Sequence, residues 1–181
     1  MKRWLAFVLA GVMGSAAAQF GSPMMGVPAP NKYQGDEEEQ PWQELESEPP
    51  AFPKQENLRE FYVSAVATNQ YFIDASTLAV GADRVVRYVL VVRTSGGATN
   101  VSFEGINCKE STWKHYATGH GDGTWMKSRA LRNEWRPIEN KPVNRHHAAL
   151  SHDFFCPAGV AINTADEGRN ALRLGKHPNA N

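Results

Sequence analysis

The sequence predicts an α+β domain, an antiparallel β-sheet with two C-terminal helices, preceded by a disordered N-terminal tail. Short runs of aromatic and β-branched residues, which favour strands, fill the first part of the domain. Helical patterns follow only near the C-terminus, and strands followed by helices are typical of the α+β class. Residues 19–50 are rich in Gly, Pro and acid and show no apolar periodicity, which predicts the tail.

The first residues have the order of a secretory signal peptide. Two basic residues precede an apolar run over residues 4–13, and three small residues end at Ala18. The run is shorter than the roughly 20 residues of a bilayer span, and no later stretch is apolar enough for one. We expect residues 1–18 to be cleaved after Ala18 and the mature protein to reach a bacterial periplasm. The alternative is a short buried helix of a cytosolic domain.

Charge is unevenly placed along a chain of formal net charge +0, and near neutrality argues against nucleic-acid binding. Residues 36–48 hold seven acids and no base, whereas bases outnumber acids over residues 127–145. Either both segments are simply solvated, or the acidic tail shields the basic surface. Trp42 and Leu45 are candidates for a small anchor on the domain. The domain is expected over residues 51–176, with a flexible C-terminus at 177–181.

The best strand is predicted over residues 84–93, because both of its faces are apolar, as in the middle of a sheet. A glycine-containing hairpin loop leads to a returning strand over 99–108. Its apolar phase shifts by one residue, which predicts a β-bulge at Gly105 and leaves Glu104 facing solvent or a groove. Further strands are expected over residues 60–67, 70–73, 111–118, 124–127 and 160–162.

Two helices are expected after the strands. The first covers residues 144–155, with Asn144 as its N-cap. The second covers about residues 165–174: Thr164 and Glu167 form a capping box before it, and Gly175 follows as its C-cap.

Cys108 and Cys156 are both in the mature chain. In an oxidising compartment, an isolated pair most simply forms a disulfide. The alternative is a pair of free thiols, one of them nucleophilic, but neither cysteine lies in a CxxC or beside a histidine.

The loop WKHYATGHGDGTW offers His115, His120 and Asp122 as metal ligands or as an acid–base pair. The competing interpretation is a plain hairpin loop, since Asp-Gly and related pairs form turns. A second group, His146, His147 and His152 with Asp153, lies on the expected first helix without convergence of its three histidines, which favours surface histidines over a metal site.

The most suggestive surface combines aromatic and basic side chains, which bind planar, anionic or sugar-like partners by stacking and charge. If buried, its tryptophans are core residues instead. The candidate residues are Trp113, Tyr116, Trp125, Arg129, Trp135 and Arg136.

Four stretches carry a family resemblance: PPAFPKQENLREF, YFIDASTLAVGADRVVRYVLVVRTSGGATNVSFEGINC, YATGHGDGTW and HDFFCPAGV. Together they resemble the cryptic neisserial protein-like (CNP-like) family of exported proteins of Gram-negative bacteria, over about residues 42–176. The resemblance implies a periplasmic domain with this cysteine pair, and it implies no catalytic residues.

The first functional hypothesis is a non-enzymatic binding or interaction module of the cell envelope that needs no cofactor and recognises an envelope protein or ligand through the aromatic–basic surface. The alternative is a metal-assisted hydrolase that uses His115, His120 and Asp122. A third possibility is an accessory factor for an envelope complex, with the acidic tail as its contact.

Overall fold

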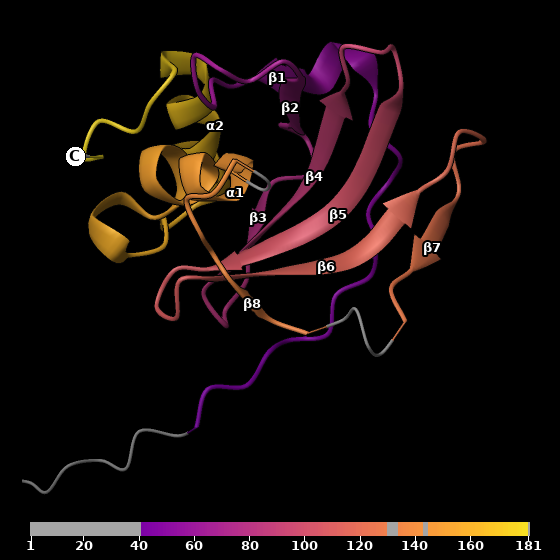
Figure 1. Ribbon diagram of the computed structural model, residues 1–181. Helices are drawn as coiled ribbons and strands as arrows, with labels where there is room; N and C mark the ends of the chain where they lie inside the picture. Colours follow the sequence, from indigo (N-terminus) through magenta and orange to yellow (C-terminus); the bar gives the residue numbers. More distant parts are fainter. Residues whose placement is uncertain (1–40, 130–133, 143–144, 181) are drawn as a thin grey trace, which may run out of the picture. The chain divides into compact units, whose positions relative to one another are not determined.

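The computed structural model describes residues 41–129, 134–142 and 145–180, and these form an antiparallel sheet with helices against one of its faces (Figure 1). The strand order is β1-β2-β4-β5-β6-β7, while β3 pairs with β4 and β8 pairs with β6. The predicted fold class is therefore confirmed. The strands are β1 (Leu58–Glu60), β2 (Gln70–Asp74), β3 (Ala79–Val80), β4 (Val85–Arg93), β5 (Thr99–Asn107), β6 (Thr112–Gly119), β7 (Trp125–Lys127) and β8 (Arg136–Pro137).

Strand β4 lies in the middle of the sheet, as its two apolar faces predicted. Val86, Tyr88 and Leu90 belong to a cluster on the helix side, whereas Val89 and Val91 belong to a second cluster on the opposite side. The chain turns back to β5 through a tight loop in which the Thr94 amide donates to the Ala98 carbonyl. Because both faces of β4 are covered, the sheet has a core on each side.

The phase shift in β5 reflects this double cover, and the bulge predicted at Gly105 is wrong. Residues 99–107 pair with β4 without interruption; the bulge lies instead in β6, where Tyr116 is the extra residue between partners of Phe103 and Glu104. Val101 and Phe103 face one cluster while Ile106 faces the other. Glu104, expected at solvent or a groove, is buried on the helix side at 4% exposure.

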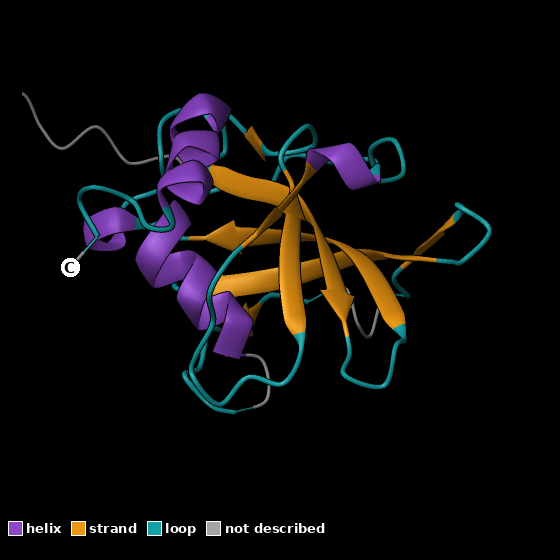
Figure 2. Cartoon of the chain, turned by 90° about the horizontal axis from the view of Figure 1, so that it is seen from above, coloured by secondary structure: helices purple, strands orange, loops and turns teal. Residues whose placement is uncertain are grey.

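The helical region follows the sheet and covers one of its faces (Figure 2). Helix α1 (Arg145–Ala149) continues directly into the π-helix η3 (Leu150–Phe155), and a 3-10 turn, η4 (Pro157–Gly159), follows. The expected strand over 160–162 is absent: these residues run in a loop in which Ala161 and Ile162 are buried. The predicted N-cap Asn144 lies outside the described residues.

Local capping signals placed helix α2 (Ala165–Leu174) correctly. The Thr164 side chain accepts a hydrogen bond from the Glu167 amide, and Gly175 ends the helix in the left-handed region with φ of 79°. The first expected strand was less accurate: residues 60–67 are mainly turn and loop, and β1 ends at Glu60 after a 3-10 turn, η1 (Gln55–Asn57).

The Cys108–Cys156 disulfide is present and joins the end of β5 to the end of η3, across a sequence separation of 48. It therefore clamps the helices to the sheet. At the C-terminus, His177 is buried, and its amide donates to the Asp153 carbonyl at 2.7 Å. The C-terminus expected to be flexible from residue 177 thus begins with an anchored residue.

The compact domain begins at residue 41, earlier than the boundary expected between residues 50 and 51. Residues 41–50 form no helix or strand, yet they contact the sheet and belong to the same compact unit as the rest of the domain. The expected signal peptide and the remainder of the tail, residues 1–40, lie outside the described residues. Within the described part of the chain, no helix has the length and apolar character needed to cross a bilayer.

Candidate functional site

Residues 41–50, which we call the strap, lie against the sheet face opposite the helices. Glu44 is the central contact: its carboxylate accepts hydrogen bonds from Lys114 Nζ at 2.6 Å, Tyr116 OH at 2.8 Å and Trp135 Nε1 at 3.1 Å. Lys114 also lies 5.5 Å from the Tyr116 ring and 5.7 Å from the Trp135 ring. One acidic side chain of the strap thus satisfies three donors of the domain.

A buried ion pair holds the backbone of the strap. Asp83 and Arg87 approach to 2.6 Å, with side chains 1% and 7% exposed. Asp83 Oδ2 accepts from the Leu45 amide, and Arg87 Nη2 donates to the Leu45 carbonyl, each at 2.9 Å. Trp42 Nε1 donates to the Asp83 carbonyl and its ring meets Trp135 edge-on at 5.8 Å. The anchor suggested by Trp42 and Leu45 is therefore seen in the structure.

The surroundings of Asp83 and Arg87 favour the charged form of both side chains. Burial acts to raise the pKa of Asp83, but the hydrogen bonds from Arg87 and from the Leu45 amide, with the Arg87 charge, outweigh it and lower that pKa. Burial likewise acts to lower the pKa of Arg87, and the Asp83 carboxylate more than reverses this. The pair therefore presents one acceptor and one donor to any backbone that lies across it.

The bulge in β6 explains the position of Tyr116. Its ring packs over Gly105, where an added Cβ would lie 2.9 Å from the ring and 3.0 Å from Val85. Burial raises the pKa of the Tyr116 phenol; the Arg87 charge opposes this and the Glu44 carboxylate adds to it. The hydroxyl therefore stays protonated and donates to Glu44 at neutral pH.

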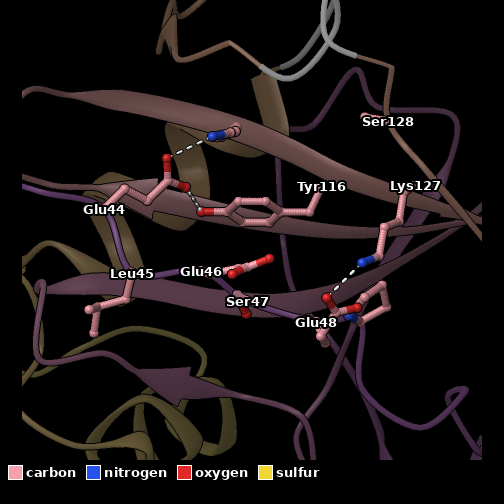
Figure 3. Close-up of a pocket in the computed structure, with 10 residues that line it drawn as sticks. Glu44, Leu45, Glu46, Ser47, Glu48, Tyr116, Lys127 and Ser128 are labelled. Carbon is pink, nitrogen blue, oxygen red and sulfur yellow. Dashed lines mark hydrogen bonds and ion pairs between the residues drawn. The ribbon is translucent and has the colours of Figure 1, made fainter.

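Beside these contacts, a hollow of about 290 Å³ lies between the strap and the sheet and opens to solvent (Figure 3). Glu46 and Glu48 line it from the strap, and Lys114, Tyr116 and Lys127 line it from the sheet. At its outer end, Lys127 and Glu48 form a 2.6 Å ion pair that is more than 60% exposed on both sides. The hollow is lined by charge and is smaller than most small-molecule pockets, which suits a peptide better than an apolar ligand.

The structure divides the residues of the predicted aromatic–basic surface between two faces. Tyr116 and Trp135 meet at Glu44, and half-buried Trp125 donates from Nε1 to the Pro50 carbonyl at 2.9 Å. Trp113 is on the opposite side, 8% exposed, stacked on a histidine of α1. Arg129 and Arg136 are exposed, and the Arg136 guanidinium lies 5.6 Å from the Trp113 ring.

The residues proposed for a hydrolase are not brought together. His115 lies in β6, where Nδ1 contacts Ser128 Oγ and Nε2 contacts Thr118 Oγ1. His120 is exposed in the turn, and Asp122 Oδ1 accepts from the Thr124 amide and hydroxyl. Among the described residues, a single group of His, Cys, Asp and Glu side chains lies at metal-binding distance, and none of these three residues belongs to it.

That single group is Glu104, His146 and His147, with one ligand atom of each within 4.8 Å of the others. His147 Nε2 lies 2.8 Å from Glu104 Oε2, and both side chains are almost fully buried. His152, by contrast, is exposed and contacts Asp153. Alternation along β5 was the signal that placed Glu104 in question, but it did not reveal that a helix covers this face.

The protonation states in this group follow from burial and charge. Burial acts to raise the pKa of Glu104, but the charge and hydrogen bond of His147, with smaller contributions from His146 and Ser102, lower that pKa to about 2. Burial and the His147 charge lower the pKa of His146 to about 4, against the effect of Glu104. At neutral pH the carboxyl is ionised and His146 is neutral.

Comparisons with known proteins agree on one family. A model of the CNP1-like family matches residues 37–173, which is well over half of the chain. A curated relative, "Cryptic neisserial protein 1" of Neisseria gonorrhoeae (strain ATCC 700825 / FA 1090), is 26% identical over 186 residues, covering 91% of this chain and 89% of the relative. No solved structure matches the chain.

Proposed function

The chain belongs to the CNP1-like family, as the sequence resemblance predicted, and we propose that it is a non-enzymatic binding module of the bacterial cell envelope. In this proposal, the module binds an extended acidic segment of a partner protein on the sheet face that the strap now covers. The strap acts as the intramolecular occupant of that face, and a partner exchanges with it.

The set of donors around Glu44 carries the proposal. A lysine, a tyrosine and a tryptophan converge on one carboxylate, so the face selects for an acid at this position. Asp83 and Arg87 bind the backbone amide and carbonyl of Leu45, and backbone contacts accept any extended chain. Lys127 adds a second acidic position at the outer end. The recognition is therefore specific for charge and conformation and tolerant of sequence.

Competition with the strap sets how tightly a partner must bind. A tethered segment acts at an effective concentration in the millimolar range for a short linker. A partner with several acids, or one held close by a second contact, displaces such an occupant, whereas a single free acidic peptide does so poorly. The strap thus limits binding to acidic segments that are presented at high local concentration.

The export half of the proposal is supported by the disulfide and by the order of residues 1–18. Disulfides persist in oxidising compartments and are rare in the cytosol. Mass spectrometry of the protein recovered from its native host tests this directly. We expect a chain that begins at Gln19 and carries an intact disulfide in the periplasmic fraction. A full-length chain with reduced cysteines in the cytosol would contradict export.

Binding is tested with a labelled peptide of the strap sequence, PWQELESEPP, added in trans to the full chain. We expect the Glu44→Gln variant to bind the peptide more tightly than the wild type, because its own strap is held less well. Adding Lys114→Met to that variant should remove the gain. Glu56→Gln, an exposed glutamate outside the strap and the hollow, is the matched control and should behave as wild type.

The peptide with all three glutamates changed to glutamine separates charge recognition from general adhesion. Equal binding of both peptides, or no gain in Glu44→Gln, would end the proposal. A photocrosslinking residue at Ser128, on the border of the hollow, then captures the partner in cells. The captured protein must carry an acidic segment whose synthetic peptide competes with the labelled strap peptide.

A further inference from the structure

A second cluster of polar side chains is buried on the other side of the sheet, away from the strap. Glu104 comes from β5, and His146 and His147 come from α1. The two imidazole rings lie 4.1 Å apart, and His147 is 1% exposed. Its Nδ1 is buried and makes no hydrogen bond, which is costly for a ring nitrogen removed from water. The hydrogen bonds of the described residues therefore leave this ring incompletely satisfied.

The three side chains are a donor set that first-row metals favour. Two imidazoles and one carboxylate bind Zn²⁺ in many proteins, with metal–ligand distances of about 2.0–2.2 Å. Ligand atoms on a tetrahedral zinc ion then lie roughly 3.3 Å apart. The ligand atoms here lie within 4.8 Å of one another, and Glu104 Oε2 and His147 Nε2 are in direct contact at 2.8 Å. Zinc binding therefore requires this hydrogen bond to open by about 0.5 Å and the half-buried His146 ring to move toward the other two ligands.

Surrounding groups orient the cluster in the way that metal ligands are usually supported. Ser102 Oγ donates to Glu104 Oε1 at 2.7 Å, and Tyr88 OH donates to Oε2 at 3.3 Å. The Trp113 ring stacks on His147 with centroids 3.7 Å apart. Tyr71 stacks on His146 at 5.2 Å. Each ring and the carboxylate is thus held by a second residue.

Two features of the backbone also bear on the site. Helix α1, which carries both histidines, continues directly into the π-helix η3. Segments of π-helix are frequent at functional sites. The Cys108–Cys156 disulfide joins the strand that carries Glu104 to the helix that carries His147. A covalent bond therefore limits how far the two ligand-bearing elements can separate.

We propose that Glu104, His146 and His147 bind one Zn²⁺ ion between β5 and α1. This site is separate from the strap face and independent of the binding function proposed above. Because its ligands come from both β5 and α1, the ion stabilises the contact between the sheet and the helices. The competing explanation is a buried Glu104–His147 ion pair that needs no metal, and the two differ in whether His146 matters.

The test uses the purified full chain and Zn²⁺ alone, in chelator-free buffer with a competing chromogenic indicator. We expect one equivalent of Zn²⁺ per chain, and Co²⁺ at the same site should give the intense visible absorption of a low-coordinate complex. Glu104→Gln and His146→Ala should each abolish stoichiometric binding. Tyr88→Phe, which removes only an outer hydrogen bond, should weaken it by about 10–100-fold.

His120→Ala and His152→Ala are the matched controls, since both residues are exposed and lie outside the cluster. Both should bind Zn²⁺ as the wild type does. If Glu104→Gln fails to fold, His146→Ala decides, because His146 is only half-buried and its loss leaves the Glu104–His147 contact in place. Absence of stoichiometric binding, binding that survives His146→Ala, or loss of binding in a control would each overturn the site.

Discussion

Glu44→Gln and Glu48→Gln make the same chemical change at two positions of the strap. Because the two positions differ in burial, we expect a large loss of stability for Glu44→Gln and a small one for Glu48→Gln. Each glutamate pairs with a lysine at 2.6 Å. The Glu44–Lys114 side chains are 21% and 11% exposed, whereas those of Glu48 and Lys127 are 65% and 64% exposed. The two ion pairs have equal distances and unequal exposure, so comparing the two variants tests directly how solvent screens the contacts of the strap.

The magnitudes follow from the contacts. A hydrogen bond to a charged group contributes about 1.5–3 kcal/mol, but the three bonds at Glu44 share one carboxylate and a glutamine keeps part of them. We therefore expect Glu44→Gln to lower the free energy of unfolding by about 2 kcal/mol. Exposed ion pairs contribute about 0–1 kcal/mol, so Glu48→Gln should cost less than about 0.5 kcal/mol.

Urea denaturation of the full chain measures both values, and a double-mutant cycle with Lys114→Met isolates the pair. The cycle should return a coupling of about 1–2 kcal/mol for Glu44 with Lys114. Hydrogen exchange at the Leu45 amide, which donates to Asp83, should quicken in Glu44→Gln and stay unchanged in Glu48→Gln. Equal losses of stability for the two variants, or no coupling to Lys114, would refute the assignment of Glu44 as the anchor.

Three further predictions concern the parts that hold the domain. Replacing both cysteines by alanine should lower stability by about 4 kcal/mol or less, because the disulfide closes a loop with a separation of 48; denaturation with and without reductant checks it. Folding lowers the pKa of Asp83, so its contribution to the free energy of unfolding is complete above the ordinary pKa of 3.8 and is lost as the pH falls through the folded-state pKa. In acid titrations, the stability of Asp83→Asn should therefore fall less steeply with pH than that of the wild type. Gly105→Ala should cost about 1–3 kcal/mol because the new Cβ would meet the Tyr116 ring at 2.9 Å, whereas Gly121→Ala, whose Cβ meets nothing within 4 Å, should be near neutral. Thermal unfolding of both variants measures the difference.

Elements with strong local signals were predictable from the sequence. The double apolar pattern of residues 85–91 placed β4 in the middle of the sheet, and the capping box at Thr164 fixed the start of α2. These signals act over a few residues, so distant packing does not override them. The disulfide was predictable from the expectation of export and from the cysteine count, without knowledge of the geometry.

The errors have a common cause in contacts between distant segments. Glu104 alternates with apolar residues on β5, but its burial depends on a histidine 43 residues later. The strap has the composition of a disordered segment, and its order depends on Lys114, about 70 residues away. In both cases a charged residue is held away from most of the solvent because a partner of opposite sign or a hydrogen-bonding ring lies across the fold. Local composition does not contain that pairing.

The two faces of the sheet differ in how permanently they are covered. The helix face is closed by a covalent bond and by an apolar cluster that includes Leu150, Phe154 and Phe155. The strap is held on the other face mainly by hydrogen bonds and ion pairs, and the proposed acidic partner would offer the same kinds of group. Apolar burial has no such exchangeable equivalent, because its stability comes from area removed from water rather than from individual donors. In the proposed function, the strap is therefore the cover of this sheet that a partner would replace, and the helices are the cover that would stay in place.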